Sequence, residues 1–183
     1  APVYYGLGNH EQRMKKYPQV YGEEYRIFEK KIQKLGVTML ENSSSFLKIK
    51  GEKIQISSLA LPEEYYKKRK KVDLSIKTMN RLAGKASKEN FHILIAHNPK
   101  YGDTYLEWGG DLILAGHYHG GMVRLPFLGG VISPDLRLFP KYCRGDFQKG
   151  NRHLIVSAGL GEHTLPVRIF NPRELVLISC VPE

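Results

Sequence analysis

Two short apolar runs, each followed closely by a histidine, constrain the fold of this chain more than any other feature of its sequence. Residues 91–96 (Phe-His-Ile-Leu-Ile-Ala) precede His97, and residues 111–115 (Asp-Leu-Ile-Leu-Ala) end two positions before His117. Runs of this length and character predict buried strands. The segment 101–108 between them is long enough for a short helix. Because strand–helix–strand units build parallel sheets, the sequence predicts an α/β fold.

Hydrophobic periodicity predicts the remaining elements. Strands are expected at residues 3–7, 37–40, 46–50, 53–56, 153–157, 167–170 and 174–179, and helices at 18–35 and 74–86. The stretch 122–150 is rich in glycine, proline and aromatic residues and is expected to form one long loop. A length of 183 residues suits a single domain, 1–183. Since 42% of the residues are hydrophobic and 25% charged, disordered and fibrous classes are excluded.

The chain carries 28 Lys and Arg against 18 Asp and Glu, a formal net charge of +10. Two basic clusters, 30–34 and 65–71, are flanked by acidic residues. A solvated helix face explains them best, and a patch for an anionic surface is the alternative. No nucleic-acid-binding motif is present, so nucleic acid is not an expected partner. No apolar window approaches the roughly 18 residues of a membrane span, and Cys143 and Cys180 are expected to be free thiols.

Polar residues that can bind metals follow three of the predicted strands. Asn9 and His10 follow the first strand, His97 follows 91–96, and His117 and His119 follow 111–115. Ligands of open α/β sheets bind outside the carboxyl ends of the strands, so these turns can converge on one site. Imidazole and amide oxygen suit Mn²⁺, Zn²⁺ or Fe ions. Each histidine alone is better explained as a hydrogen-bonded loop residue, but the three strand ends together favour a metal site.

Three segments match a known family in order and spacing. Residues 8–11 (Gly-Asn-His-Glu), 95–99 (Ile-Ala-His-Asn-Pro) and 116–121 (Gly-His-Tyr-His-Gly-Gly) resemble the later signature blocks of the calcineurin-like metallophosphoesterase superfamily. Residues 116–126, together with 138–142 and 159–168, look more narrowly like the bacterial YkuE-type phosphodiesterase branch, which includes membrane-associated enzymes and related lipid-precursor hydrolases. The resemblance covers nearly the whole chain.

The resemblance implies a two-sheet α/β sandwich flanked by helices (α/β/β/α) that holds two divalent metal ions, Mn, Fe or Zn. Asn9, His97 and His117 would hold one ion, His119 would hold the other, and His10 would be the catalytic acid. In such a centre the cations polarise the phosphoryl group and provide a bridging hydroxide, while an imidazolium protonates the leaving oxygen. The implied activity is hydrolysis of phosphodiesters, with lipid-linked substrates suggested by the narrower branch.

The sequence also departs from the family pattern. The family places an Asp-x-His block and a Gly-Asp-x-x-Asp block upstream of the turn at Asn9, where this sequence has only eight residues. We therefore expect an N-terminally incomplete domain that holds one metal ion or none by itself, because His119 alone cannot hold a second ion. An inactive half-domain is thus the first alternative to an active phosphodiesterase, and a basic nucleic-acid-binding or nuclease module is the less favoured second one. The uncovered sheet edge predicts pairing with a second copy, a homo-oligomer. Tyr118 and Met122 replace the usual Thr and Gln, which affects substrate orientation.

Several other residues admit two interpretations. Arg124, His163 and Arg168 are predicted to contact a substrate phosphate, although ordinary surface positions explain them about as well. His92 and His153 lie within apolar runs and are expected to be structural. The segment 125–142 mixes apolar and basic residues, so it either rests on lipid headgroups or folds onto the chain's own core. The compartment, membrane-associated or cytoplasmic in a bacterium, is left open, since any targeting segment would lie in the missing part.

Overall fold

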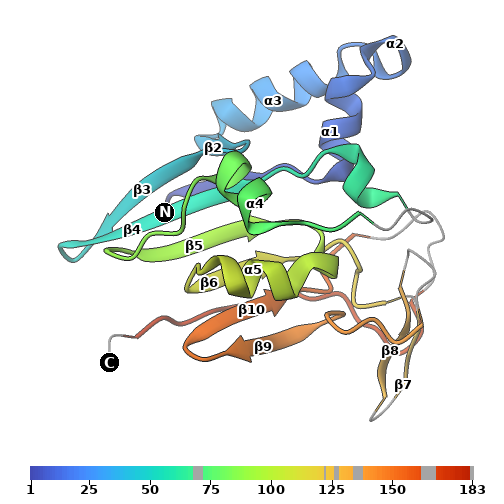
Figure 1. Cartoon of the computed structure of the whole chain (residues 1–183). Coiled ribbons are helices and arrows are strands. Elements are labelled where there is room, and N and C mark those ends of the chain that lie inside the picture. The colour runs from blue at the N-terminus through green and yellow to red at the C-terminus, as the bar shows by residue number, and fades with distance from the viewer. Residues whose placement is uncertain (68–71, 122, 126–127, 134–137, 162–167, 182–183) are drawn as a thin grey trace.

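The computed structural model describes residues 1–67, 72–121, 123–125, 128–133, 138–161 and 168–181 (Figure 1). Its helices are α1 (Asn9–Lys16), α2 (Pro18–Tyr21), α3 (Glu24–Lys34), α4 (Ile76–Ala83) and α5 (Gly102–Trp108), with 3-10 turns η1 (Glu63–Tyr66) and η2 (Pro99–Tyr101). Its strands are β1 (Val3–Gly6), β2 (Val37–Leu40), β3 (Ser44–Ile49), β4 (Glu52–Leu59), β5 (Phe91–Ala96), β6 (Leu112–Ala115), β7 (Val123–Leu125), β8 (Gly129–Ile132), β9 (Gly145–Lys149) and β10 (Arg152–Val156).

A six-stranded sheet forms the centre of the molecule, in the order β3-β4-β5-β6-β10-β9. The four inner strands run parallel, and β3 and β9 pair antiparallel at the two edges. The unit β5, α5, β6 is the predicted strand–helix–strand unit. The expected α/β class is therefore confirmed.

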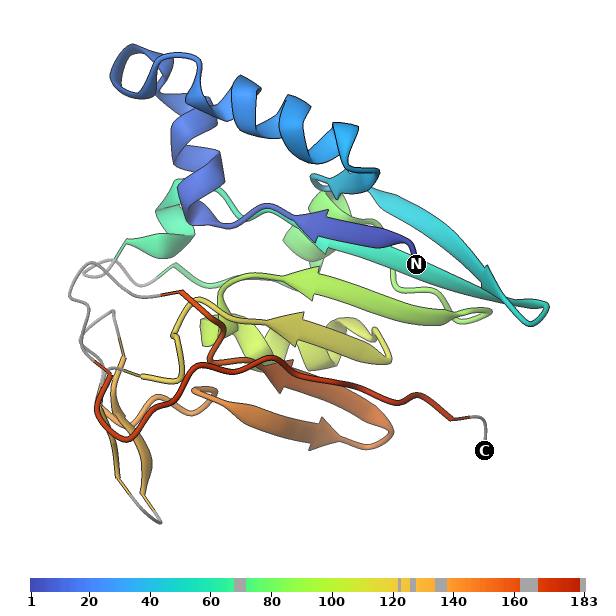
Figure 2. The ribbon, with the colours of Figure 1, turned by 180° about the vertical axis from the view of Figure 1, so that it is seen from behind.

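The two faces of this sheet are covered differently. Helices α4 and α5 lie on one face (Figure 1), where Leu94, Ile113 and Leu154 are fully buried in the main core. On the opposite face β1 lies in front of β4 and β5 (Figure 2), and it pairs in parallel with β2 as a second, small sheet. The molecule is thus a mixed α/β fold with a large sheet flanked by helices, consistent with the expected architecture.

Gly6 allows β1 to approach the six-stranded sheet closely. A Cβ atom at this position would lie 2.6 Å from Ile95 Cγ2 and 2.7 Å from Ser58 Oγ. We expect Gly6→Ala to lower the free energy of unfolding by about 1–3 kcal/mol through overpacking, measured by urea denaturation. Gly116→Ala is the matched control, because a Cβ there would meet no atom within 4 Å. Equal losses in both variants would contradict this account of β1 packing.

The helical segment predicted at 18–35 is two helices, α2 and α3. Gly22 ends α2 with a φ of 57°, a left-handed conformation that glycine adopts without strain. Helix α1 was not predicted. Asn9 and His10 were expected on a turn, but they begin this helix, which buries none of its residues fully and so lacks a strong apolar period.

The prediction of one long loop at 122–150 is wrong. Its described residues contain β7 and β8, which form an antiparallel hairpin standing apart from the main sheet (Figure 2), and β9, which pairs with β10. These strands are short, and β8 begins with two glycines, so their period-2 pattern is weak. The edge strand β9 also alternates between polar and apolar residues less clearly than the inner strands do.

The strand predicted at 174–179 is also wrong, because this segment runs extended without a strand ladder. Leu175 and Leu177 are 87% and 93% exposed, so the apolar residues that suggested a strand lie partly in solvent. In the segment predicted at 167–170, residue 167 lies outside the described part, and Ile169 forms a single bridge to Val123.

His92 is a buried structural histidine, as predicted. Its Nδ1 accepts a hydrogen bond from the Ser87 backbone N–H at 2.9 Å, so Nε2 carries the proton and donates to Ser57 Oγ at 2.7 Å. Burial lowers the pKa of His92 below the usual value. His153 is structural too, since its Nδ1 lies 3.0 Å from the Asp146 carboxylate.

The lowered pKa of His92 predicts a loss of stability in acid. Below about pH 6.5 the unfolded chain binds a proton at this residue more readily than the folded chain does. The contribution of His92 is therefore complete above that pH and declines as the pH falls. We expect His92→Gln to reduce the slope of unfolding free energy against pH between 7.5 and 5, measured by urea titration. Identical slopes for the variant and the wild type would contradict this prediction.

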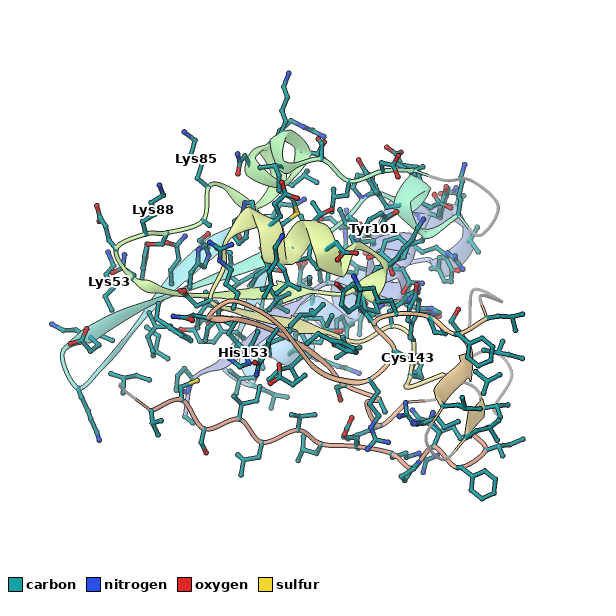
Figure 3. The ribbon with its side chains drawn as sticks, turned by 60° about the horizontal axis from the view of Figure 1, so that its bottom comes forward. Lys53, Lys85, Lys88, Tyr101, Cys143 and His153 are labelled. Carbon is teal, nitrogen blue, oxygen red and sulfur yellow. The ribbon has the colours of Figure 1, made fainter. Side chains whose placement is uncertain are left out.

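Part of the positive charge lies away from the carboxyl ends of the strands. Lys53, Lys85 and Lys88 project from the end of the molecule at which β4 and β5 begin (Figure 3). The lysines of cluster 30–34 are exposed on α3, as the helix-face interpretation expects, and residues 68–71 lie outside the described part. Both cysteines are free thiols, as predicted. Among the described residues, no helix combines the length and apolar character required to cross a bilayer.

Candidate metal centre

The predicted site residues gather at the carboxyl ends of β1, β5 and β6. Beyond these ends lies a hollow of about 250 Å³, lined by Tyr5, Gly6, Gly8, Asn9, His10, Glu11, His97, His117 and His119. The first turn of α1 supplies Asn9 and His10, and the turns after β5 and β6 supply the other three histidines. The structure therefore brings all five predicted metal-binding and acid residues to one hollow. Their chemical roles stay predictions.

Two distances between donor atoms in this hollow match the spacing of neighbouring ligands on one metal ion. Asn9 Oδ1 lies 2.9 Å from His97 Nε2, and His97 Nε2 lies 3.2 Å from His117 Nδ1. Metal–ligand bonds of about 2.0–2.1 Å place neighbouring ligand atoms about 2.9–3.4 Å apart. Within the described residues, His, Cys, Asp and Glu alone form no metal-binding group of three. The Asn9 amide oxygen is the third donor that we assign to the set. These residues fit one divalent cation.

Burial keeps the imidazole of His97 neutral. It lowers the pKa of His97 to about 4, so the imidazole is neutral at pH 7 and its lone pair is available to a metal. The Tyr66 ring packs edge-on to His117 at a centroid distance of 5.3 Å and lies 6.1 Å from His97. Tyr66 thus helps to fix the orientation of both imidazoles.

Glu11 holds the first turn of α1 in place. Its Oε2 accepts a hydrogen bond from the Gly8 backbone N–H at 2.9 Å. This contact is the glutamate half of a capping box, since glycine at the N-cap has no side chain to make the other half. Among the described lining residues Glu11 is the single carboxylate. No role was predicted for Glu11 from the sequence, although glutamate three residues after a helix N-cap is a known capping signal. Tyr66 was also missed, because it lies in a charged segment with no periodic pattern.

The predicted phosphate-binding residues Arg124 and Arg168 are not among the described residues that line the hollow. Arg124 Nη1 donates to the Gly120 carbonyl oxygen at 3.1 Å, and Arg168 Nη2 donates to that of Ala158 at 2.9 Å. His163 lies outside the described residues. The part of these three side chains in substrate binding stays a prediction.

A second cavity of about 300 Å³ adjoins the hollow through Asn9. It is lined by Asn9, Gln12, Arg13, Lys15, Lys16, Glu41, Leu61, Pro62, Glu63, Glu64 and Tyr66. Its basic side chains are partly neutralised, since Lys15 pairs with Glu41 and Lys16 pairs with Glu63. There is therefore space beside the metal centre for a larger part of a substrate.

The α/β sheet, with an asparagine and histidines at its carboxyl edge, agrees with the arrangement that the resemblance to metallophosphoesterases implies. The family model described as calcineurin-like phosphoesterase matches residues 1–121 of the chain. This chain belongs to the calcineurin-like phosphoesterase family. The recognised segments 8–11, 95–99 and 116–121 all lie within the matched region.

Curated relatives are similar over different parts of the chain. YkuE of Bacillus subtilis, an uncharacterised metallophosphoesterase, is 33% identical over 102 residues, which are 56% of this chain and 34% of YkuE. The phosphodiesterase YaeI of Escherichia coli is 27% identical over 169 residues, 88% of this chain and 52% of YaeI. LpxG of Chlamydia muridarum, a UDP-2,3-diacylglucosamine pyrophosphatase, is 30% identical over 103 residues, 50% of this chain and 29% of LpxG.

This chain thus spans about a third of YkuE and about half of YaeI. No solved structure matches the chain significantly.

Proposed function

We propose that this chain is a metal-dependent phosphodiesterase domain in which Asn9, His97 and His117 hold a divalent cation. The observation that carries the proposal is the 2.9 Å and 3.2 Å spacing of their donor atoms at the carboxyl edge of the sheet. The family match, and the similarity to a protein named as a phosphodiesterase, support the reaction type.

The residues of the hollow would have different roles in phosphoester hydrolysis. Divalent cations supply Lewis-acid polarisation of the phosphoryl oxygens and a water molecule of lowered pKa. His119 lines the same hollow and is our candidate ligand for the second ion of the family's dinuclear centre, which this chain would hold only where further ligands complete the site. His10 is exposed on the first turn of α1, where its imidazolium can protonate the leaving oxygen. The cavity that shares Asn9 would accommodate the remainder of the substrate.

The reaction is tested by comparing bis-p-nitrophenyl phosphate with p-nitrophenyl phosphate after loading with Mn²⁺. We expect turnover of the diester to exceed that of the monoester, to disappear on chelation and to return with added Mn²⁺. A metal-saturated chain without turnover would favour the alternative, a half-domain that binds at most one metal ion without being an enzyme by itself.

We further propose that the substrates are lipid-linked and are met at a membrane surface. The β7–β8 hairpin and the segment after it expose large apolar side chains, with Leu128 63%, Leu138 68% and Phe139 58% exposed. Such a patch suits the apolar part of a lipid substrate or its headgroup boundary. Co-sedimentation with anionic vesicles should fall in the double variant Leu128→Ser, Leu138→Ser. Unchanged co-sedimentation, or none for the wild type, would contradict the proposal.

Self-association is the remaining proposal about partners. The six-stranded sheet ends in β3 and β9, each paired on one side only. An open edge of this kind can pair with a second copy. Light scattering should therefore give a mass above that of one chain, and a monomer at high concentration would contradict this proposal.

A further inference from the structure

The turn that carries His117 and His119 has an unfavourable backbone. His117 and His119 have φ values of 58° and 49°, and Gly120 and Gly121 follow at 75° and 89°. For a residue with a Cβ atom, the left-handed conformation costs roughly 1–2 kcal/mol. Such conformations persist only where the surroundings hold them. Something outside the turn is therefore expected to hold it in place.

Asn171, about fifty residues further along the chain, holds the turn through two carbonyl oxygens, beside the contact of Arg124 with the Gly120 carbonyl oxygen. Its Nδ2 donates hydrogen bonds of 2.6 Å to the carbonyl oxygens of both His119 and Gly121. The residue is only 3% exposed. A Cβ atom at Gly120 would lie 2.5 Å from Asn171 Oδ1, so the amide occupies the space that glycine leaves open. The side chain thus fits closely against the turn and satisfies two of its backbone acceptors.

The segment around Asn171 is itself fastened to the body of the protein. The Arg124 backbone N–H donates to the Ile169 carbonyl oxygen at 3.0 Å. Arg168 Nη2 donates to the carbonyl oxygen of Ala158, two residues beyond the end of β10. Asn171 is therefore held in place, and its hydrogen bonds can fix the position of the turn.

We propose that Asn171 is a positioning residue for the metal centre, which fixes the turn 117–121 so that His117 and His119 face the hollow. The inference rests on the proposed metal site, since it assigns Asn171 a role in metal affinity. The donor half of the amide makes both contacts to the turn. Among the described residues Oδ1 has no hydrogen-bond partner, so a side chain of the same shape without N–H groups should fail.

The test compares Mn²⁺ affinity by isothermal titration calorimetry in the wild type and three variants. Asn171→Asp keeps the shape but replaces Nδ2, which carries both N–H donors, with an oxygen atom that faces the two carbonyl oxygens. We expect its Mn²⁺ affinity to be about 10–100-fold lower, the range for losing a residue that orients metal ligands. Asn171→Ser retains one hydroxyl donor, should give an intermediate affinity, and serves where Asn171→Asp does not fold. Asn90→Asp makes the same chemical change in a remote turn, where Nδ2 donates to Ser87 Oγ, and should bind Mn²⁺ like the wild type.

A second readout separates positioning from general stability. The visible absorption of bound Co²⁺ reports coordination geometry, and we expect it to change in the Asn171 variants but not in Asn90→Asp. Folded Asn171 variants with wild-type Mn²⁺ affinity and an unchanged Co²⁺ spectrum would overturn this inference alone. A wild-type chain that binds no Mn²⁺ would overturn both the inference and the proposed function.

Discussion

His117→Ala is expected to reduce kcat/KM for bis-p-nitrophenyl phosphate by about 10³-fold or more, about 4 kcal/mol of transition-state stabilisation. His117 Nδ1 lies 3.2 Å from His97 Nε2, and its removal leaves only Asn9 and His97 in the set. Catalytic metal sites generally need three protein ligands, so the ion should be lost together with the activity. Steady-state kinetics at saturating Mn²⁺ measure the fall in kcat/KM, and elemental analysis measures the loss of the bound ion.

His153→Ala is the matched control for this prediction. His153 lies on β10, at the end of the sheet where that strand begins, and it pairs with the Asp146 carboxylate. The substitution removes an imidazole without touching the hollow, so activity should stay within about twofold of the wild type. If His117→Ala keeps a tenth or more of the wild-type activity while still folded, His117 is not a metal ligand.

His10→Ala is expected to lower kcat by about 10²–10⁴-fold, the usual contribution of a general acid. Because His10 is not part of the Asn9, His97 and His117 donor set, the affinity for Mn²⁺ should not change. The loss should depend on the leaving group, since an alkoxide needs a proton more than p-nitrophenolate does. Kinetics with an alkyl p-nitrophenyl phosphate and with a dialkyl phosphate would measure this difference.

The kinetics and Mn²⁺ affinity of His10→Ala show whether His10 is a general acid or a structural residue. Equal losses for good and poor leaving groups, or weaker Mn²⁺ binding in His10→Ala, would contradict the assigned role. His10 is exposed on the first turn of α1, so its removal should leave the core intact. Thermal unfolding of the variant would confirm that its fold is retained.

The centre of the fold was predictable because local patterns and the observed structure agree there. The apolar run 91–96 is β5 residue for residue, and the run at 111–115 contains β6. These inner strands are buried and parallel, which makes their sequences continuously apolar. Helix α1 and the β7–β8 hairpin were missed, since neither contributes a fully periodic apolar face. The strand expected at 174–179 failed because alternation of apolar residues does not by itself provide a pairing partner.

The candidate site could be predicted only for residues that closely follow a strand. Asn9, His97 and His117 each follow a strand, and the carboxyl ends of parallel strands meet at one edge. The residues that support them leave weaker signals. Tyr66 and Asn171 act across long separations in the chain, through ring packing and through hydrogen bonds to backbone carbonyl oxygens. Such contacts have no fixed spacing, so only the folded structure reveals them.

The central claim is that Asn9, His97 and His117 together hold a divalent cation. The most direct test is Mn²⁺ stoichiometry by elemental analysis after loading with excess metal and desalting, for the wild type and for His117→Ala. We predict one ion per wild-type chain and essentially none for the variant. A wild-type chain without Mn²⁺, or equal Mn²⁺ in folded His117→Ala, would contradict the claim.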